Sequence, residues 1–138
     1  MHADNWAIKA KKMGFRSRAV FKLEEILKKI DPKQKYQNVL DIGSSPGGWS
    51  QYIVKKYHNV NMHALDILDM EPIDGVHFHK ESIENIDNIR EIKKLKGVFN
   101  LVISDIAPNL SGISAIDEAN IFELNRLTIK IAKDYLSN

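Results

Sequence analysis

A short apolar run that leads directly into a glycine-rich turn is the feature that most constrains the fold of this chain. Residues 38–42 read N-V-L-D-I, which is typical of a short buried strand, and residues 43–48 read G-S-S-P-G-G. Glycines let the backbone turn sharply and approach a ligand closely. A helix expected from about Trp49 to Tyr57 would present its free N–H groups to that turn. This order predicts a ligand-binding α/β unit.

The rest of the chain continues to alternate between strand and helix patterns. We expect strands at 60–65, 76–79 and 98–104, and helices at 17–30, 82–96 and from 114 or 117 to 136. Ser17 and Ser82 are the expected N-caps, and Asp31 before Pro32 is the expected end of the first helix. Residues 98–104 are apolar enough to be buried on both faces. The alternation predicts one open, mostly parallel α/β sheet with flanking helices.

Composition narrows the class of protein. A length of 138 residues, of which 43% are hydrophobic and 28% charged, fits one globular domain. The absence of cysteine excludes disulfide scaffolds, thiol catalysis and cysteine-based zinc sites. No apolar run approaches the roughly 18 residues of a membrane span, and the N-terminus lacks the apolar block of a secretory signal. We therefore expect a soluble intracellular protein that binds no membrane.

Positive charge is concentrated at the N-terminal end. Residues 1–37 hold ten Lys and Arg against four Asp and Glu, whereas residues 38–138 hold ten against fourteen. A basic arm ahead of an acidic body favours a polyanionic partner such as nucleic acid, although a solvated lysine-rich helix face would explain the charge equally well. We divide the domain into a basic N-terminal arm and helix, 1–37, and an α/β core, 38–138.

Three aspartates lie where the predicted strands end. Asp41 lies just before the glycine-rich turn, Asp66 closes the second strand and Asp105 follows the last one. Asp66, 23 residues after Gly43, can accept hydrogen bonds from both ribose hydroxyls of an adenosine. A carboxylate beside the turn suits the ammonium group of S-adenosylmethionine and would repel a pyrophosphate. These features favour S-adenosylmethionine and disfavour a nicotinamide-dependent oxidoreductase.

Four segments, in order, form a signature that covers essentially the whole chain. They are G-F-R-S-R-A-V-F-K-L (14–23), D-I-G-S-S-P-G-G-W-S-Q (41–51), Asp66 with M-E-P-I (70–73), and S-D-I-A-P-N-L-S-G (104–112). Together they resemble the FtsJ-like (RrmJ-type) ribosomal RNA 2′-O-methyltransferases. The resemblance implies a Rossmann-like methyltransferase fold that uses S-adenosylmethionine. The implied substrate is a ribose 2′-hydroxyl of RNA, expected to be a uridine of large-subunit ribosomal RNA.

The resemblance also implies roles for individual residues. In the family a Lys-Asp-Lys-Glu tetrad surrounds the ribose 2′-hydroxyl, which makes Lys22 the first lysine and Asp105 the aspartate of the catalytic group. The hydroxyl must lose its proton and align with the sulfonium methyl, and Asp105 would orient the lysine beside it. The expected cofactor-binding residues are Asp41, Gly43, Pro46, Gly47, Gly48, Trp49, Asp66, Ser82 and Asp105.

The chain departs from the family pattern in two places. Ser82 stands where the family has an aspartate that binds adenine, and Glu81 is an alternative acceptor. The family continues with three more strands that carry the second lysine and the glutamate. We therefore expect these 138 residues to be part of a longer chain or a truncated product that binds cofactor weakly and lacks full catalysis. The alternative function is a catalytically impaired fragment or an RNA- or ribosome-binding remnant.

The basic arm supplies the candidate RNA contacts. They are Lys9, Lys12, Arg16, Arg18 and Lys22. Contacts to phosphate position RNA without reading its sequence. Trp6 is expected to pack the arm against the domain, whereas Trp49 either contacts the cofactor or fills the core.

Three histidines on neighbouring strands, His63, His77 and His79, lack a further convergent ligand, so we expect no metal site. The expected compartment is the cytoplasm or an organelle matrix. The sequence leaves the oligomeric state open, although an exposed apolar edge strand at 98–104 would favour self-association.

Overall fold

Four parallel strands form the centre of the molecule in a computed structural model that describes residues 3–105 and 111–138. In spatial order they are β3 (Val76–Lys80), β2 (Asn61–Asp66), β1 (Asn38–Ile42) and β4 (Leu101–Ser104). Each neighbouring pair is parallel, so the predicted open α/β sheet is confirmed. The strand order reverses between β1 and β4, and in such sheets ligands bind at the carboxyl ends of the strands beside that reversal.

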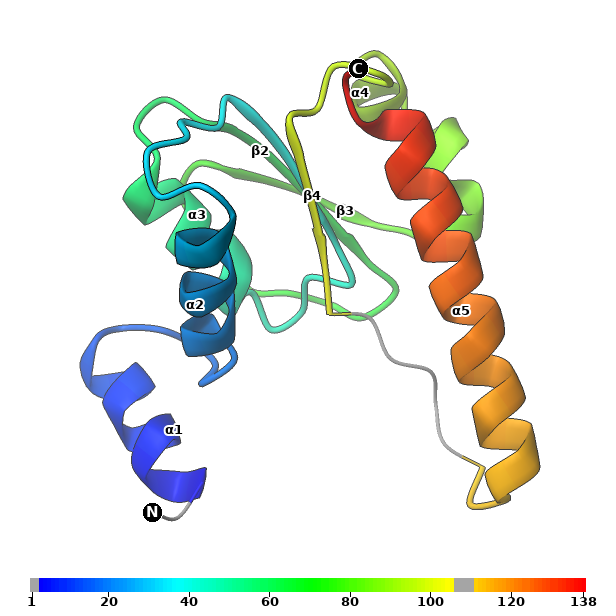
Figure 1. Ribbon diagram of the computed structural model, residues 1–138, viewed down its shortest axis with the longest axis horizontal. Coiled ribbons are helices and arrows are strands. Elements are labelled where there is room, and N and C mark those ends of the chain that lie inside the picture. Colours follow the sequence, from blue (N-terminus) through cyan, green and yellow to red (C-terminus); the bar gives the residue numbers. More distant parts are fainter. Residues whose placement is uncertain (1–2, 106–110) are drawn as a thin grey trace.

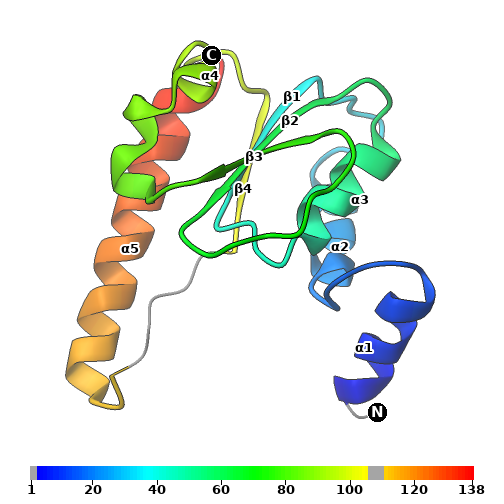
Figure 2. The ribbon, with the colours of Figure 1, turned by 180° about the vertical axis from the view of Figure 1, so that it is seen from behind.

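Helices cover both faces of the sheet (Figures 1 and 2). They are α1 (Ala3–Lys12), α2 (Val20–Ile30), α3 (Gly48–Lys56), the 3₁₀ helix η1 (Ile83–Asn88), α4 (Arg90–Lys93) and α5 (Ser114–Tyr135). Two hydrophobic clusters separate the layers: α2 and α3 pack on one face, whereas η1, α4 and α5 pack on the other. The first turns of α5 extend past the sheet, on the side away from α1.

The alternation of side chains along β1 decides where its aspartate lies. Val39 belongs to the cluster under α2 and α3, and Leu40 and Ile42 belong to the cluster under α5. Because successive side chains of a strand point to opposite faces, Asp41 shares the face of Val39. The carboxyl group is therefore buried next to α3, with 1% of the residue exposed.

Helix α2 begins three residues later than predicted. The Ser17 hydroxyl accepts a hydrogen bond from the Ala19 N–H at 3.1 Å, which makes a turn before the helix instead of its first capped turn. The helix proper starts at Val20. Its end agrees with the prediction, because Asp31 has an extended backbone ahead of Pro32.

The single helix predicted at 82–96 is two short pieces, η1 and α4, separated by the extended residue Ile89. The spacing of the isoleucines at 83, 86, 89 and 92 explains the difference. All four are buried; Ile83 and Ile86 lie on one side of η1 because that segment winds at about three residues per turn, and the break at Ile89 lets Ile92 reach the same cluster from α4. Ser82 caps η1 as predicted, accepting from the Glu84 N–H at 3.3 Å.

Strand β4 is shorter and less buried than predicted. Residues 98–100 lie outside it, and Leu101 and Val102 are only partly buried, whereas Ile103 is 7% exposed. Among the described residues β4 pairs with β1 alone, so burial on both faces is wrong for most of the strand. The Asn100 side chain ends the pairing by accepting from the N–H groups of residues 37 and 38.

Residues 3–12 form a helix that the sequence pattern did not predict. Trp6 packs as expected, with its ring centroid 5.4 Å from that of Phe21 on α2. Ala10 is 1% exposed and joins the cluster under α2. With few apolar residues among lysines, α1 depends on these tertiary contacts.

Candidate active site

Two connected cavities lie at the carboxyl ends of β1, β2 and β4. The large cavity has a volume of about 730 Å³, and the narrow cavity beside it has a volume of about 40 Å³. Gly43, Ser45 and Asp105 line both of them. The two cavities therefore form one candidate site around the glycine-rich turn.

Most of the residues predicted to bind a cofactor line one of these cavities. The large cavity is lined by Gly43, Asp66, Ser82 and Asp105. The narrow cavity is lined by Asp41, Gly43, Pro46, Gly48, Trp49 and Asp105. Gly47 lines neither. The three aspartates, far apart in the sequence, are thus brought together because parallel strands end at one edge of the sheet.

The glycine-rich turn fixes the orientation of Asp66. The Ser45 N–H donates to Asp66 Oδ2 at 2.9 Å, and the Leu68 N–H donates to Oδ1 at 2.9 Å. Each carboxylate oxygen has room for a second donor, so Asp66 can still accept from a ligand. Leu68 and the neighbouring Ile67 are more than half exposed beside it and offer an apolar surface in the large cavity.

Asp41 is the buried acid of the site. Its Oδ2 accepts a hydrogen bond from the Ser50 hydroxyl on α3 at 2.8 Å. Burial raises the pKa of Asp41 to about 7; the Ser50 hydrogen bond opposes the increase, and the negative charges of Asp66 and Asp105 add to it. A cationic group in the narrow cavity would lower the pKa of Asp41 and so favour its ionised form.

Gly47 and Gly48 lie where other parts of the chain pack closely against the backbone. Gly47 has φ of +115°, and a Cβ there would lie 2.7 Å from Ile73 Cδ1 and 3.3 Å from Arg16 Nη1. A Cβ on Gly48 would lie 3.0 Å from that of Ser17. Protein atoms therefore take the space of a side chain at Gly47 and crowd it at Gly48, and the cofactor contacts expected at both positions stay a prediction.

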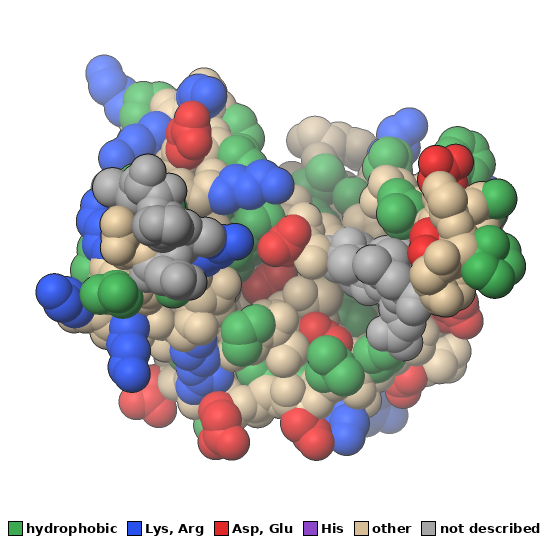
Figure 3. Space-filling model, turned by 90° about the horizontal axis from the view of Figure 1, so that it is seen from below, with side chains coloured by type: hydrophobic (Ala, Val, Ile, Leu, Met, Phe, Trp, Pro, Cys, Tyr) green, Lys and Arg blue, Asp and Glu red, His purple; other side chains and the backbone are tan. Residues whose placement is uncertain are grey.

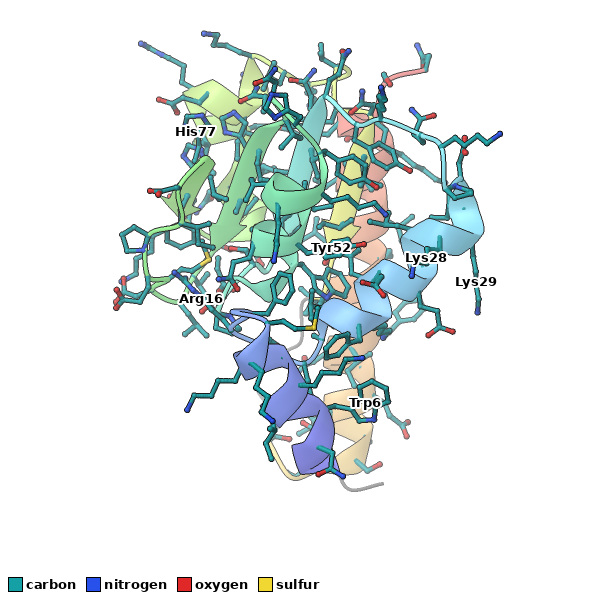
Figure 4. All side chains as sticks on the ribbon, turned by 90° about the vertical axis from the view of Figure 1, so that its left-hand side faces the viewer. Trp6, Arg16, Lys28, Lys29, Tyr52 and His77 are labelled. Carbon is teal, nitrogen blue, oxygen red and sulfur yellow. The ribbon has the colours of Figure 1, made fainter. Side chains whose placement is uncertain are left out.

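Arg16, which we expected to contact RNA, forms three hydrogen bonds within the protein, and its role in RNA binding stays a prediction. Its Nη1 donates to the carbonyl oxygens of Pro46 at 3.1 Å and Glu71 at 2.6 Å, and its Nη2 donates to that of Pro72 at 2.8 Å. Figure 4 shows the side chain reaching from the α1–α2 connection toward the segment after β2. One guanidinium therefore ties the glycine-rich turn to the segment that packs against Gly47.

The other basic candidates lie on the surface. Lys9 has its Nζ 5.4 Å from the ring centroid of Trp6 and 5.0 Å from that of Phe21. Lys12, Arg18 and Lys22 are exposed. Neither Lys22 nor Lys12 lines the large or the narrow cavity, so the structure does not bring Lys22 into the same cavity as Asp105.

Trp49 fills the core, as one of its two expected alternatives has it, and the other alternative, contact with a cofactor, stays a prediction. The side chain is 8% exposed and belongs to the cluster under α2 and α3, yet it also lines the narrow cavity. Its Nε1–H donates to the Ala19 carbonyl oxygen at 2.7 Å, which joins α3 to the start of α2.

Charge is unevenly distributed around the site. Figure 3 shows Lys and Arg side chains gathered over the half of the molecule formed by α1 and α2, and acidic side chains in the hollow between that half and α5. The acidic residues lining the large cavity are Asp66, Glu81, Glu84, Asp105 and Glu123. A cationic ligand in the hollow and a polyanion along the basic half would both be attracted.

The sequence-based expectations missed several lining residues. Ser44 and Ser45 stood in the glycine-rich run and could have been included on that signal. The α5 residues that line the large cavity are Asn120, Glu123, Leu124, Arg126 and Leu127. No motif marks them, because their place depends on how α5 returns across the sheet.

The histidines form a contact group on β2 and β3, away from the cavities. His63 Nδ1 lies 3.1 Å from His79 Nε2, and the His63 and His77 rings stack with centroids 4.9 Å apart. Burial, with the nearby His77 and His79, lowers the pKa of His63 to about 4. Within residues 3–105 and 111–138 no group of three or more potential ligands could hold a metal ion. In the same ranges no helix is long and apolar enough to cross a membrane.

Known proteins resemble the chain over most of its length. Residues 15–138 match the model of a family described as FtsJ-like methyltransferase. A ribosomal RNA large subunit methyltransferase E of Dechloromonas aromatica is 38% identical over 136 residues, and one of Buchnera aphidicola subsp. Schizaphis graminum is 43% identical over 137 residues. These matches cover 96% and 97% of this chain. They cover 66% of each relative, so the chain spans about two thirds of the length of these curated relatives.

A solved structure supports the same grouping. A protein of Plasmodium falciparum, described as a ribosomal RNA methyltransferase, is similar with a TM-score of 0.75 and 30% sequence identity. The match covers 89% of this chain and 73% of that one. Sequence and fold thus point to one family.

Proposed function

Because this chain belongs to the FtsJ-like methyltransferase family, we propose that it takes part in methyl transfer from S-adenosylmethionine to a ribose 2′-hydroxyl of RNA. One observation carries the proposal: Asp41, Asp66 and Asp105 surround two connected cavities at the carboxyl ends of three parallel strands. Relatives named as methyltransferases support an enzyme over an RNA-binding remnant.

The donor set of the cavities suits S-adenosylmethionine. The oriented carboxylate of Asp66 can accept from the ribose hydroxyls of the adenosine, beside the apolar surface of Ile67 and Leu68. Ser82 and Glu81 line the same cavity and can accept from the adenine amino group. The buried carboxyl of Asp41 in the narrow cavity suits the ammonium of the methionine part. Gly43, Pro46, Gly48 and Trp49 complete its walls.

We assign Asp105 and Lys22 as the residues of this chain that act on the ribose. When bound, the cofactor supplies an electrophilic methyl group on a sulfonium. Asp105 lines both cavities, so its carboxylate can offset the sulfonium charge and accept a hydrogen bond from the attacking hydroxyl. The exposed Lys22 would approach from the basic half and hold the negative ribose–phosphate in line.

Large-subunit ribosomal RNA is the proposed substrate, with a uridine as the modified nucleotide. The names of the relatives support ribosomal RNA of the large subunit, and their bacterial sources support the cytoplasm as the compartment. Lys9, Lys12, Arg18 and Lys22, all exposed, would bind phosphates along the basic half of the molecule.

Calorimetric titration of the purified chain tests the cofactor assignment. We expect saturable binding of S-adenosylmethionine, none of NAD, and a loss of about 100-fold in affinity in Asp66→Ala, because a charged acceptor of two hydroxyls disappears. A folded chain that binds NAD instead, or an Asp66→Ala variant with unchanged affinity, would contradict the proposal. Transfer of labelled methyl from S-adenosylmethionine to large-subunit ribosomal RNA, followed by nucleoside analysis for a 2′-O-methyl group, tests the reaction.

A further inference from the structure

A third cavity lies outside the two cavities assigned to the cofactor. Its volume is about 660 Å³, comparable to that of the large cavity. Its walls come from α1, the α1–α2 connection, the glycine-rich turn and residues 69–71. We name it the outer cavity.

The inner surface of the outer cavity is apolar. Ala7 and Ala10 of α1 have small side chains that leave the space open. Phe15 and Met70 also line it. Packing holds Phe15 in place: its ring centroid lies 6.3 Å from that of Tyr52, and Lys55 Nζ lies 5.1 Å from it. Aromatic rings and thioethers are surfaces on which nucleobases stack without dependence on sequence.

Uncommitted cations complete the lining. Lys11 and Arg18 are exposed, and neither forms an ion pair with the part of the chain that the structure describes. Of the two acidic residues in the lining, Asp69 is paired with Lys80 at 2.9 Å, and Glu71 carries the remaining negative charge. Two free cations beside an apolar surface fit a base together with its phosphate.

The outer cavity adjoins the narrow cavity of the candidate active site. Ser17, Ser45 and Pro46 line both the outer and the narrow cavity. A ligand in the outer cavity would therefore share these three residues with a ligand in the narrow cavity. A nucleotide next to the methylated one in the same RNA strand could therefore reach the outer cavity.

We propose that the outer cavity binds one unstacked nucleotide of the RNA, next to the nucleotide whose ribose is methylated. Its base would lie against Met70 and the small exposed part of Phe15, which is 9% exposed, and its phosphate would contact Lys11 and Arg18. The inference rests on the proposed function and adds that the substrate is single-stranded on at least one side of the target. An acidic peptide would satisfy the cations but would make no use of the stacking surface.

Filling the cavity is the direct test. Ala7→Trp places an indole in the space from the exposed side of α1, and Lys11→Glu reverses one of its charges. We expect each variant to bind a fluorescent, single-stranded 12-residue oligoribonucleotide about 10-fold more weakly by anisotropy, in line with the contribution of one stacked base or one phosphate contact. The same strand in a duplex should bind the unaltered chain at least about 10-fold more weakly than the single strand.

Matched variants serve as controls. Asn5→Trp adds the same side chain to α1, and Lys33→Glu makes the same charge change in the basic half; both positions are exposed and line none of the three cavities. We expect both controls to bind the oligonucleotide as the unaltered chain does. All four variants should keep the affinity for S-adenosylmethionine, which also reports that they are folded.

The other possible results would contradict either the nucleotide site or the proposed function. Ala7→Trp with unchanged oligonucleotide affinity, or equal loss in Asn5→Trp, would overturn the nucleotide site. Absence of any oligonucleotide binding would overturn it as well. Equally tight binding of a poly-glutamate peptide, abolished by Ala7→Trp, would replace the nucleotide by a protein ligand. Oligonucleotide binding that depends on the cavity, in a chain that binds no S-adenosylmethionine, would instead contradict the proposed function and leave the site standing.

Discussion

The two walls of the large cavity are held in place very differently. The wall made by the glycine-rich turn is fixed by hydrogen bonds to Asp66, by the Ser45 hydroxyl donating to the Asp69 carbonyl oxygen at 3.0 Å, and by Arg16. The wall made by α5 has its only buried residues, Ile131 and Tyr135, beyond the cavity, whereas Leu124 and Leu127 in the cavity wall pack only partly buried against the same cluster. The carboxylates that would select a ligand thus lie beside the wall held by hydrogen bonds, and the α5 wall is held by fewer and less buried contacts.

Among the changes that compare the two walls, removal of the Arg16 side chain should have the largest effect. Arg16→Ala deletes one charge-assisted hydrogen bond to Pro46 of the turn and two to residues 71 and 72. We therefore expect a 10- to 100-fold loss of S-adenosylmethionine affinity, about 1.4–2.8 kcal/mol. Arg16→Lys should recover little, because an ammonium cannot reproduce the planar fork. Calorimetry measures both, and added methylguanidinium should partly restore binding in Arg16→Ala. Unchanged cofactor affinity in Arg16→Ala would show that the turn holds its shape alone.

Asp41 should couple cofactor binding to pH. Its pKa of about 7 in the folded chain lies above the ordinary 3.8, so its effect on stability is most favourable below pH 3.8 and is lost as the pH rises through 7. We expect Asp41→Asn to melt a few degrees higher than the unaltered chain at pH 8 and to bind S-adenosylmethionine about 10-fold more weakly. Titrations at pH 7 in buffers of different ionisation enthalpy should show proton release on binding only with Asp41 present. No dependence on the buffer would contradict this role.

Acid should loosen the packing of the buried end of α5. The His63 ring lies 6.2 Å from that of Phe99, which in turn lies 6.4 Å from Tyr135, and the Tyr135 hydroxyl donates to Asp87. With a folded pKa of about 4, below the ordinary 6.5, His63 supports stability above pH 6.5, and that support is lost as the pH falls toward 4. We expect the melting temperature to fall by roughly 5 °C over this range, and by less in His63→Gln. A parallel decline in both proteins would assign the acid sensitivity to other groups.

Changes on the α5 wall should have the smallest effect. Leu124→Ala or Arg126→Ala removes a side chain that lines the large cavity from α5. We expect less than about 3-fold change in S-adenosylmethionine affinity by calorimetry, because the helix can shift and the carboxylates on the other wall remain. A loss as large as that of Arg16→Ala would mean that both walls contribute equally to recognition.

The local patterns of the sequence determined most of the fold and the chemical character of the site. The apolar runs at 38–42 and 60–65, each ending beside an aspartate, were enough to predict two strands. Their parallel order was enough to predict carboxylates at one edge of the sheet. Such patterns are reliable because strand periodicity and turn chemistry act within a few residues. The motif segments added the family, which residues 15–138 match.

The tertiary structure alone decided how these parts are used. Arg16 looked like any other cation of a basic arm until its guanidinium was found on carbonyl oxygens more than 50 residues away. The space at Gly47 likewise belongs to Ile73, and the 3₁₀ winding of 83–88 follows from burying its two isoleucines against the sheet. Sequence patterns show which side chains a segment carries. Which distant residues those side chains contact is determined only when the strands and helices pack together.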